Sequence, residues 1–265
     1  MKKCFLCMLL FYKLGWSAFE TDAVDPRNWS LGNSVLSLTG GAVSLWANPA
    51  GLALTSGWEA YFGYSNQFGL TELSQQAVAV SYDLKTVGLG IGLANFGKPD
   101  FYLEQKITLA AGRTILNGFR LGAGFNYLLQ KASGYSSQSA VSIDAGAIWE
   151  YEKFRAGAVA KNINQPRMGG DRIARNYNLG ISYLAFDQLD LSAGLYYDAD
   201  FKEQFQLGQE TRIADNLALR LGFQTEPNRY SLGAGFFFSK FDLDYAFVNH
   251  PDLGASHAVG LLFKW

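Results

Sequence analysis

From Trp58 to the C-terminus, apolar side chains alternate with small or polar ones at every second position. In the stretch TVGLGIGLANF, Val87, Leu89, Ile91 and Leu93 share one face, and glycine and alanine occupy the other. The same division recurs in GFRLGAGFNY, LDLSAGLYYD, NLALRLGFQT and FDLDYAFVNH. A period of two residues with one apolar face is typical of a β-strand.

Counting these runs gives fourteen predicted strands: Trp58 to Ser65, Gln75 to Leu84, Thr86 to Asn95, Glu104 to Arg113, Phe119 to Gln130, Ser139 to Glu150, Lys153 to Asn162, Arg175 to Phe186, Leu189 to Asp198, Glu203 to Ile213, Leu217 to Thr225, Arg229 to Phe238, Phe241 to Asn249 and His257 to Trp265. A sandwich places a turn about every 8–12 residues. Barrel strands that cross a bilayer need about 10 residues each plus a connection. The wider spacing here therefore predicts an all-β fold, a transmembrane antiparallel β-barrel of about 14 strands.

The connections between these strands alternate in length. Tight ones such as DLK, YE, DQ, ADN and SK follow even-numbered strands, and longer ones such as NQFGLTELS and INQPRMGGDRIA follow odd-numbered strands. Outer-membrane barrels have short periplasmic turns and longer external loops. TILNG after the fourth strand and EPN after the eleventh depart from this rule. The pattern as a whole predicts the side of the membrane on which each connection lies.

The second face of the strands is polar and rich in glycine and alanine. Its predicted lumen-facing charges are Arg120, Asp144, Asp190, Glu210, Arg212, Arg220, Asp242 and Asp244. Fourteen strands enclose more space than such small side chains fill, so water or another part of the chain must enter the lumen. Whether the charges form a selective ion path or only a solvated wall stays open at this point.

Aromatic residues gather at the predicted strand ends. At the short-turn end they include Tyr82, Trp149 and Trp265, and at the other end Tyr64 and Tyr177 are examples. Amphipathic rings favour the two boundaries between lipid and water, where they form girdles. Aromatic residues also favour strands in general, but their concentration at the ends favours the girdle interpretation.

The first 18 residues have the layout of a secretory signal peptide. Lys2 and Lys3 precede an apolar stretch from Cys4 to Tyr12, and small residues follow near the expected cleavage site. Lys13 interrupts this region, and the apolar stretch is too short to span a bilayer. We therefore expect export, with residues 1–18 removed.

Composition narrows the possible partners. Both cysteines, Cys4 and Cys7, lie in the predicted leader, so the mature chain has no thiol for a disulfide or a metal site. Removing its three lysines leaves 19 basic residues (22 − 3) against 23 acidic ones, a net charge of −4. This mild acidity argues against a nucleic-acid partner.

The chain offers little catalytic chemistry. His250 and His257 are its two histidines, and both lie in or beside the last long connection. His257, with Asp242 and Asp244 on the neighbouring strand, is the sole candidate for a hydrolase-type site, and its parity points toward lipid. The glycine pairs lie within strands and open no helix, so they form no nucleotide-binding motif. We expect no enzyme activity, no metal and no cofactor.

One segment between the leader and the first strand is apolar without a strand pattern. In SLWANPAGLA and the residue after it, Leu45, Trp46, Leu52 and Leu54 need burial. Pro49 cannot donate a hydrogen bond to a sheet, which suits a turn inside the barrel better than a wall strand. The sequence therefore predicts that this segment plugs the lumen.

The motif GGAVSLWANPAGLA, with Asn48, Pro49, Ala50 and Gly51 at its centre, resembles the N-terminal hatch of the FadL-type outer-membrane transporter superfamily. The closing DYAFVNHPDLGASHAVGLLFKW resembles the PorV/PorQ branch of that superfamily. The resemblance covers nearly the whole mature chain. It implies a division into a signal peptide (1–18), a hatch segment (19–57) and an outer-membrane barrel (58–265) of a Gram-negative bacterium.

The alternating Val259, Leu261, Phe263 and Trp265 at the C-terminus match an outer-membrane C-terminal signal. This match implies the barrel-assembly machinery as a partner during biogenesis and outer-membrane lipid as the surroundings of the mature protein.

The function implied by the resemblance is the passage or binding of hydrophobic compounds. The alternative, carried by the PorV/PorQ branch, is a non-enzymatic shuttle or scaffold for secreted proteins in type IX-like secretion or cell-surface assembly. The external connections are too short for a large capture groove, which argues against long-chain fatty acids. Gly88, Gly90 and Gly92 could form a lateral gate, because glycine tolerates kinks. Alternatively, these glycines make room for the hatch.

Overall fold

The computed structural model describes residue 19 and residues 24–34, 40–198 and 202–265. The predicted leader, residues 1–18, lies outside the described residues. In the described part of the chain, three short helices precede the strands: α1 (Pro26–Ser30), α2 (Ser44–Ala47) and the 3-10 helix η1 (Pro49–Leu54). Fourteen strands form the barrel: β1 (Trp58–Gln67), β2 (Leu70–Asp83), β3 (Gly88–Lys98), β4 (Tyr102–Leu116), β5 (Phe119–Ala132), β6 (Gln138–Tyr151), β7 (Phe154–Lys161), β10 (Asn176–Phe186), β11 (Leu189–Asp198), β12 (Gln204–Ala214), β13 (Leu217–Gln224), β14 (Arg229–Phe237), β15 (Phe241–His250) and β16 (Gly254–Lys264).

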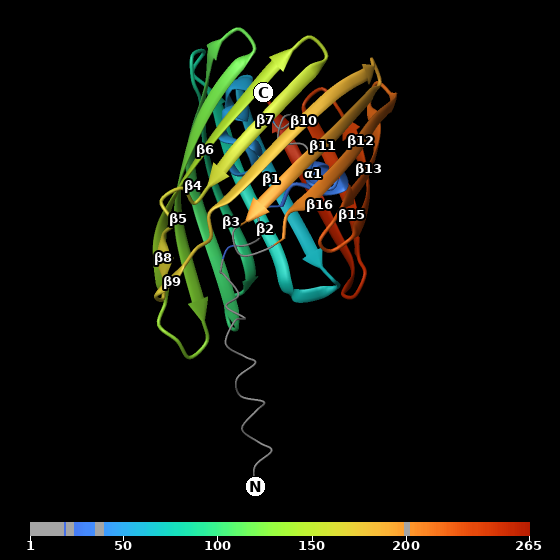
Figure 1. The fold of residues 1–265 in the computed structure, drawn as a ribbon. Helices are drawn as coiled ribbons and strands as arrows, with labels where there is room; N and C mark the ends of the chain where they lie inside the picture. The colour runs from blue at the N-terminus through green and yellow to red at the C-terminus, as the bar shows by residue number, and fades with distance from the viewer. Residues whose placement is uncertain (1–18, 20–23, 35–39, 199–201) are drawn as a thin grey trace.

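The strands form one closed antiparallel barrel (Figure 1). Each strand pairs with its neighbour in sequence, and β1 pairs with β16 from Glu59 opposite Lys264 to Asn66 opposite His257. Closure leaves the barrel without an unpaired edge. A small hairpin lies outside the ring, in the connection between β7 and β10. Its two strands, β8 (Arg167–Met168) and β9 (Asp171–Arg172), have two residues each. The predicted barrel of 14 antiparallel strands is confirmed.

The alternation in the sequence determines which side chains point outward. On β5, Leu121, Phe125 and Tyr127 are 42%, 48% and 41% exposed, whereas the intervening Gly124 and Asn126 are buried. The same division holds around the ring, so the outer surface is apolar and the inner surface is polar or small. An outer surface of this kind suits hydrocarbon and not water.

NQFGLTELS and TILNG are two of the connections that differ from the sequence-based prediction. NQFGLTELS was expected to be a long loop, but β1 and β2 run through it and leave a turn of only Phe68 and Gly69. Their positive φ angles, 56° and 72°, fit a tight hairpin. TILNG shortens in the same way, to a turn of Asn117 and Gly118. Both connections are shorter than expected because the strands continue beyond their predicted ends: β2 starts at Leu70 instead of Gln75, and β4 ends at Leu116 instead of Arg113.

Rings form pairs at the strand ends. At the short-turn end, Trp58 lies 4.4 Å from Tyr82 between ring centroids, and Phe238 lies 4.4 Å from Phe241. At the opposite end, the rings of Tyr177 and Tyr197 lie 6.4 Å apart. Apolar strand centres therefore lie between two zones of aromatic rings, as the girdle interpretation requires.

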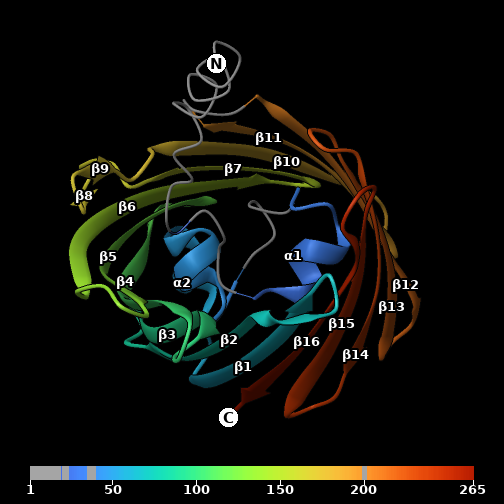
Figure 2. The same ribbon diagram turned by 90° about the horizontal axis from the view of Figure 1, so that it is seen from below.

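The short helices lie inside the ring of strands, as Figure 2 shows for α1 and α2. The principal buried apolar cluster joins Leu45, Trp46 and Leu52 of this segment to small residues on the inner wall, such as Ala79 and Ala110. Within the described residues, no helix is long and apolar enough to cross a membrane. The main apolar core of the molecule, which is the cluster described above, lies where the N-terminal segment contacts the inner wall.

Candidate functional site

The Asn-Pro-Ala motif connects the hatch segment to the barrel wall. The Asn48 side chain is fully buried, and its Oδ1 atom accepts a hydrogen bond from the Ala50 amide at 3.2 Å, which caps η1. Its Nδ2 atom donates to the carbonyl oxygens of Ala147 at 3.1 Å and Ala158 at 3.5 Å, on β6 and β7. Pro49 stands in the first turn, where the missing amide hydrogen costs no bond. One asparagine thus begins the helix and joins it to two strands.

Small residues let η1 approach the wall closely. A Cβ atom added at Gly122 would lie 2.3 Å from the Ala50 amide nitrogen, and one at Gly146 would lie 2.0 Å from Asn48 Oδ1. One at Gly112 would lie 2.5 Å from the Pro49 carbonyl oxygen. Any larger side chain at these positions would displace the helix.

The three glycines considered for a lateral gate lie under the same segment. An added Cβ would lie 1.8 Å from the Leu52 carbonyl oxygen at Gly88, 3.0 Å from Leu52 Cδ2 at Gly90 and 2.5 Å from Trp46 Cζ2 at Gly92. Strand β3 pairs with β2 and β4 without a shift of register. In this structure the glycine row is covered by hatch residues, an arrangement that fits the alternative of making room for the hatch.

Three of the four apolar hatch residues expected to need burial are enclosed. Leu45 and Trp46 are each 2% exposed, and Leu52 is 0% exposed. The expectation is wrong for Leu54, which is 42% exposed. Leu54 is the last residue of η1, where the chain leaves the inner wall toward β1, so its side chain lacks a wall to pack against.

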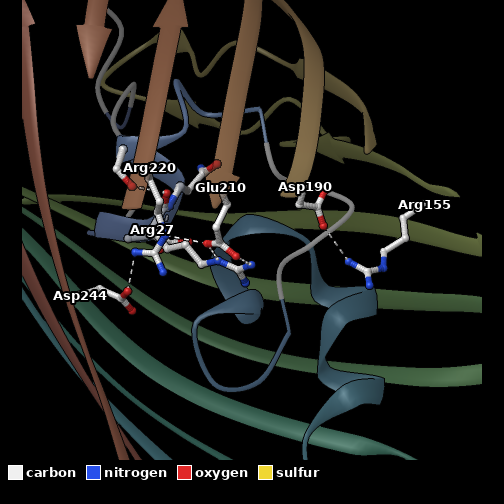
Figure 3. A network of polar contacts seen from close by, with 9 residues as sticks. Arg27, Arg155, Asp190, Glu210, Arg220 and Asp244 are labelled. Atoms are coloured by element: carbon white, nitrogen blue, oxygen red, sulfur yellow. Dashed lines mark hydrogen bonds and ion pairs between the residues drawn. The ribbon is translucent and has the colours of Figure 1, made fainter. Parts of the chain in front are cut away.

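A network of charges centred on the buried Arg220 connects α1 to the strands beside it, across the lumen from η1 (Figure 3). Arg27 of α1 binds Glu210 of β12 with two hydrogen bonds, Nε to Oε2 at 2.9 Å and Nη2 to Oε1 at 2.8 Å. Arg220 of β13 donates to the same carboxylate at 2.6 Å and to Asp244 of β15 at 2.5 Å. The Arg220 side chain is completely buried. The network thus joins one hatch residue to three strands.

Most of the remaining charges expected in the lumen have partners there, but Arg212 lies exposed at the rim. Arg155 joins Asp190 and Glu150, and Glu150 also accepts from Arg120 at 2.9 Å. Asp144 accepts from Asn126 and Asn162, and Asp242 pairs with Lys264. The Arg212 guanidinium lies over the Phe237 ring. Ion pairs and hydrogen bonds within the barrel therefore neutralise most of the charges that face the lumen.

Asp25 begins α1 and is enclosed between the helix and the wall. Its Oδ1 atom accepts from the Asn28 amide at 3.2 Å, the usual geometry of a helix N-cap. Burial raises the pKa of this carboxyl to about 6, and the Asn28 hydrogen bond opposes that effect. The nearby Glu210 carboxylate raises the pKa of Arg27, which keeps its positive charge. The α1 contact therefore combines a fixed charge with a titratable one.

A cavity of about 400 Å³ lies on the loop side of α1 and α2. Its wall includes Trp29 and Trp46 from the hatch segment and His250 from the end of β15. The second histidine, His257, points away from the lumen and bonds Tyr245 at 2.8 Å. Among the described residues, no three potential metal ligands cluster. The C-terminal Val259, Phe263 and Trp265 are also exposed on the outer surface.

Sequence reasoning missed several of these residues. It did not find Arg27 or the N-cap Asp25, although Asp-Pro before a short polar run is a recognisable helix start. It also missed Glu150 and Arg155, which lie near the ends of their strands. Both residues alternate with outward-facing aromatic residues on their strands, and this alternation could have indicated that they point inward.

Together, the strands and the inner segment define a class of fold: a closed barrel of 14 antiparallel strands with short helices inside it. The chain is similar to three solved structures. They are a Pseudomonas aeruginosa FadL homologue (TM-score 0.68, 12% identity, covering 92% of this chain and 98% of that chain), the monoaromatic hydrocarbon channel CymD (0.73, 14%, 92% and 98%) and the P. putida toluene transporter TodX (0.66, 9%, 92% and 99%). At these identities the likeness shows a shared fold.

Sequence comparison adds one partial match. The family described as "F plasmid transfer operon, TraF, protein" matches residues 126–234, from within β5 to within β14. No curated protein matches the chain by sequence.

Proposed function

We propose that this chain is an outer-membrane β-barrel of a Gram-negative bacterium that mediates the passage or binding of hydrophobic compounds. The shared fold supports this proposal, because the solved neighbours include a hydrocarbon channel and a toluene transporter. These neighbours are transporter channels and not enzymes, in keeping with a chain that does no catalysis. The apolar outer surface and the aromatic zones support a position in a membrane.

One observation carries the proposal: the apolar contact inside the barrel. Leu52 and Trp46 lie against a wall of glycine and alanine on β2, β3 and β4. Moving these two side chains away would uncover a smooth apolar surface that presents no charge to a hydrocarbon. The proposed route for a hydrophobic compound runs along this surface, and Gly88, Gly90 and Gly92 act as its gate once the hatch residues that cover them move away.

In the same proposal, residues 19–57 act as the hatch and residues 1–18 as a cleaved leader. The hatch closes the lumen until its contact with β3 loosens. The charged contact of α1 lies on the other side of the lumen, so the segment can stay attached there while η1 moves. The partners are then outer-membrane lipid and small hydrophobic molecules.

Uptake of a hydrophobic fluorescent tracer into liposomes tests this function. The reconstituted protein should transport the tracer faster than protein-free liposomes, and Leu52→Ala should increase the rate further by loosening η1. Leu191→Ala is the matched control, because Leu191 is an exposed leucine of the outer surface. Absence of tracer uptake, together with a secreted protein that co-purifies, would overturn the proposal in favour of a secretion or surface-assembly component.

A further inference from the structure

The connection between β7 and β10 carries an excess of positive charge. Residues 162–175 include Arg167, Arg172 and Arg175 against one acidic residue, Asp171, a balance of +2 (3 − 1), whereas the whole chain has a net charge of −1. None of the ion pairs among the described residues includes one of these arginines. The connection therefore presents three cations that are not paired with an acidic side chain of the described part of the chain.

The small hairpin of β8 and β9 places two of these arginines side by side. Arg167 lies opposite Arg172 in the antiparallel register, so both side chains leave the same face of the hairpin, and both residues are exposed. On the other side of the hairpin, Met168 and Ile173 are buried against a leucine of β5, and Asp171 lies opposite Met168. Like charges directly opposite each other are destabilising. An anion bound between the two guanidinium groups would remove this repulsion.

Asn164 attaches the base of the same connection to the edge of β6. Its Nδ2 atom donates to the Val141 carbonyl oxygen at 2.8 Å, and its Oδ1 atom accepts from the Ile143 amide at 3.1 Å. The Ile163 amide donates to the Ile143 carbonyl oxygen at 2.9 Å. Figure 2 shows β8 and β9 outside the ring of strands, next to β6. The arginines are therefore held at the outer wall of the barrel.

The third arginine lies at the boundary of the apolar outer surface. Arg175 Nη1 donates to the hydroxyl oxygen of Tyr177 at 3.3 Å, in the aromatic zone at the loop-side end of the barrel. At the base of the connection, Val141 and Ile143 are 39% and 44% exposed on the outer surface of β6. In a bilayer, aromatic zones lie at the level of the lipid headgroups. A lipid bound here would place its headgroup beside the arginines and its acyl chains along β6.

Phosphate is the headgroup chemistry that fits this arrangement. The planar fork of donors on a guanidinium group matches the oxygen atoms of a phosphate. A phosphate monoester carries a charge of about −1.5 to −2 at pH 7, which balances the excess of the connection. A zwitterionic headgroup adds an ammonium group, which the arginines repel. The cations and the apolar surface together therefore favour an acylated lipid with phosphate monoesters over a neutral one.

We propose that Arg167, Arg172 and Arg175 form a binding site for an anionic lipid of the outer leaflet whose headgroup carries phosphate monoesters, the chemistry of lipid A. The inference rests on the proposed position of the chain in the outer membrane. It is independent of the proposed route for hydrophobic compounds, which runs inside the barrel between η1 and β3, whereas this site lies on the outer wall beside β6.

Native mass spectrometry of the full-length protein in detergent tests the proposal. The protein is titrated with lipid A and, separately, with phosphatidylethanolamine. We expect lipid A to bind in preference to phosphatidylethanolamine. The double variant Arg167→Gln/Arg172→Gln should weaken lipid A binding by about tenfold or more, because it removes charge-assisted hydrogen bonds to phosphate. Inorganic phosphate at the concentration of the lipid should not displace it, since free phosphate lacks the contact with the apolar wall.

Lys153→Gln/Lys240→Gln is the matched control, because it also removes two positive charges from exposed residues, but in the turns at the opposite end of the barrel. It should bind lipid A as the wild type does, and all variants should retain the heat-modifiable migration of a folded barrel. Equal affinity for the two lipids, equal weakening by the two double variants, or full displacement by inorganic phosphate would overturn the proposal.

Flotation with liposomes separates this inference from the proposed function. A wild-type protein that does not insert into liposomes would contradict the proposed position in a membrane. Insertion and tracer uptake without a preference for lipid A would contradict the lipid site alone.

Discussion

The hatch segment contacts opposite sides of the barrel in two different ways. On one side, η1 and α2 meet β3, β4 and β5 through leucine, tryptophan, alanine and glycine. On the other side, α1 meets β12, β13 and β15 through buried charges centred on Arg220. Both contacts use glycine for close approach, as Gly88 does under Leu52 and Gly222 does under Gly32. The two contacts differ in side-chain chemistry, because one is apolar and the other is charged.

The two kinds of contact differ in how much movement they allow. A buried ion network demands one geometry and loses several kcal/mol when a partner is missing, although its net contribution to stability is small. An apolar contact depends on the fit of surfaces and tolerates sliding more easily. The comparison therefore suggests that α1 is the fixed end of the hatch and η1 the movable end.

The largest expected effect comes from breaking the charged contact. Arg220→Met leaves the buried Glu210 with Arg27 as its remaining cation and removes the ion pair between Arg220 and Asp244. We expect a loss of about 3–5 kcal/mol in unfolding free energy, measured by denaturant titration in detergent. Arg212→Met at the exposed rim is the control. Equal losses for the two variants would contradict a special role for the network.

Protonation of Asp25 changes the α1 contact alone, so it separates the contribution of this contact from that of the η1 contact. The pKa of this carboxyl rises from its usual value near 4 to about 6 in the folded protein. The folded state therefore binds the proton more tightly, and the contribution of Asp25 to stability falls as pH rises from 4 to 6. The shift corresponds to roughly 3 kcal/mol.

Asp25→Asn keeps the helix cap and imitates the neutral carboxyl. Between pH 4 and pH 7, the wild type should lose stability relative to this variant, and protease cleavage of the hatch segment measures the change. Parallel pH profiles for the two proteins would refute the assignment.

Breaking the apolar contact should have a smaller effect. Gly88→Ala places a methyl group 1.8 Å from the Leu52 carbonyl oxygen, so η1 must move, at a cost of about 1–3 kcal/mol. Gly124→Ala is the matched control, because its nearest neighbour would be Asp144 Cβ at an ordinary 3.7 Å. Thermal unfolding of the two variants should differ accordingly. A Gly124→Ala loss as large as that of Gly88→Ala would mean that close approach of η1 is unimportant.

The smallest effect is expected from a charge pair outside both contacts. Lys98 and Glu72 are 2.8 Å apart on the outer parts of β3 and β2, with side chains about half exposed. Exposed pairs of this kind contribute about 0–1 kcal/mol. Glu72→Gln should therefore leave the unfolding midpoint nearly unchanged, and a large shift would place the loop-side ends of these strands among the elements that hold the fold.

Much of the fold could be predicted from the sequence because the outer surface imposes a strict period of two. The starts of β1 and β11 agree with the prediction to the residue. The extension of β2 to Leu70 could not be predicted, since Thr71 and Glu72 lie beyond the apolar stretch and lack its signal.

The site could be predicted only in part. The alternation along each strand correctly placed residues such as Arg220 on the inner face, but it could not reveal which of them contact the hatch. Arg27 and Glu210 are separated by 183 positions, and no local pattern connects them. The exposure of Leu54 also depends on where the chain turns toward β1, which apolar character alone does not determine.

Single-channel conductance in planar bilayers tests the central claim, that the hatch segment closes the lumen, most directly. The wild type is compared with a deletion of Leu31 to Ala53, which removes α2 and all of η1 except Leu54, and with a control shortened at Arg167 to Arg172, outside the ring. The account predicts low conductance for the wild type and the control, and a large open-channel conductance for the hatch deletion. Equal conductance in all three proteins would contradict it.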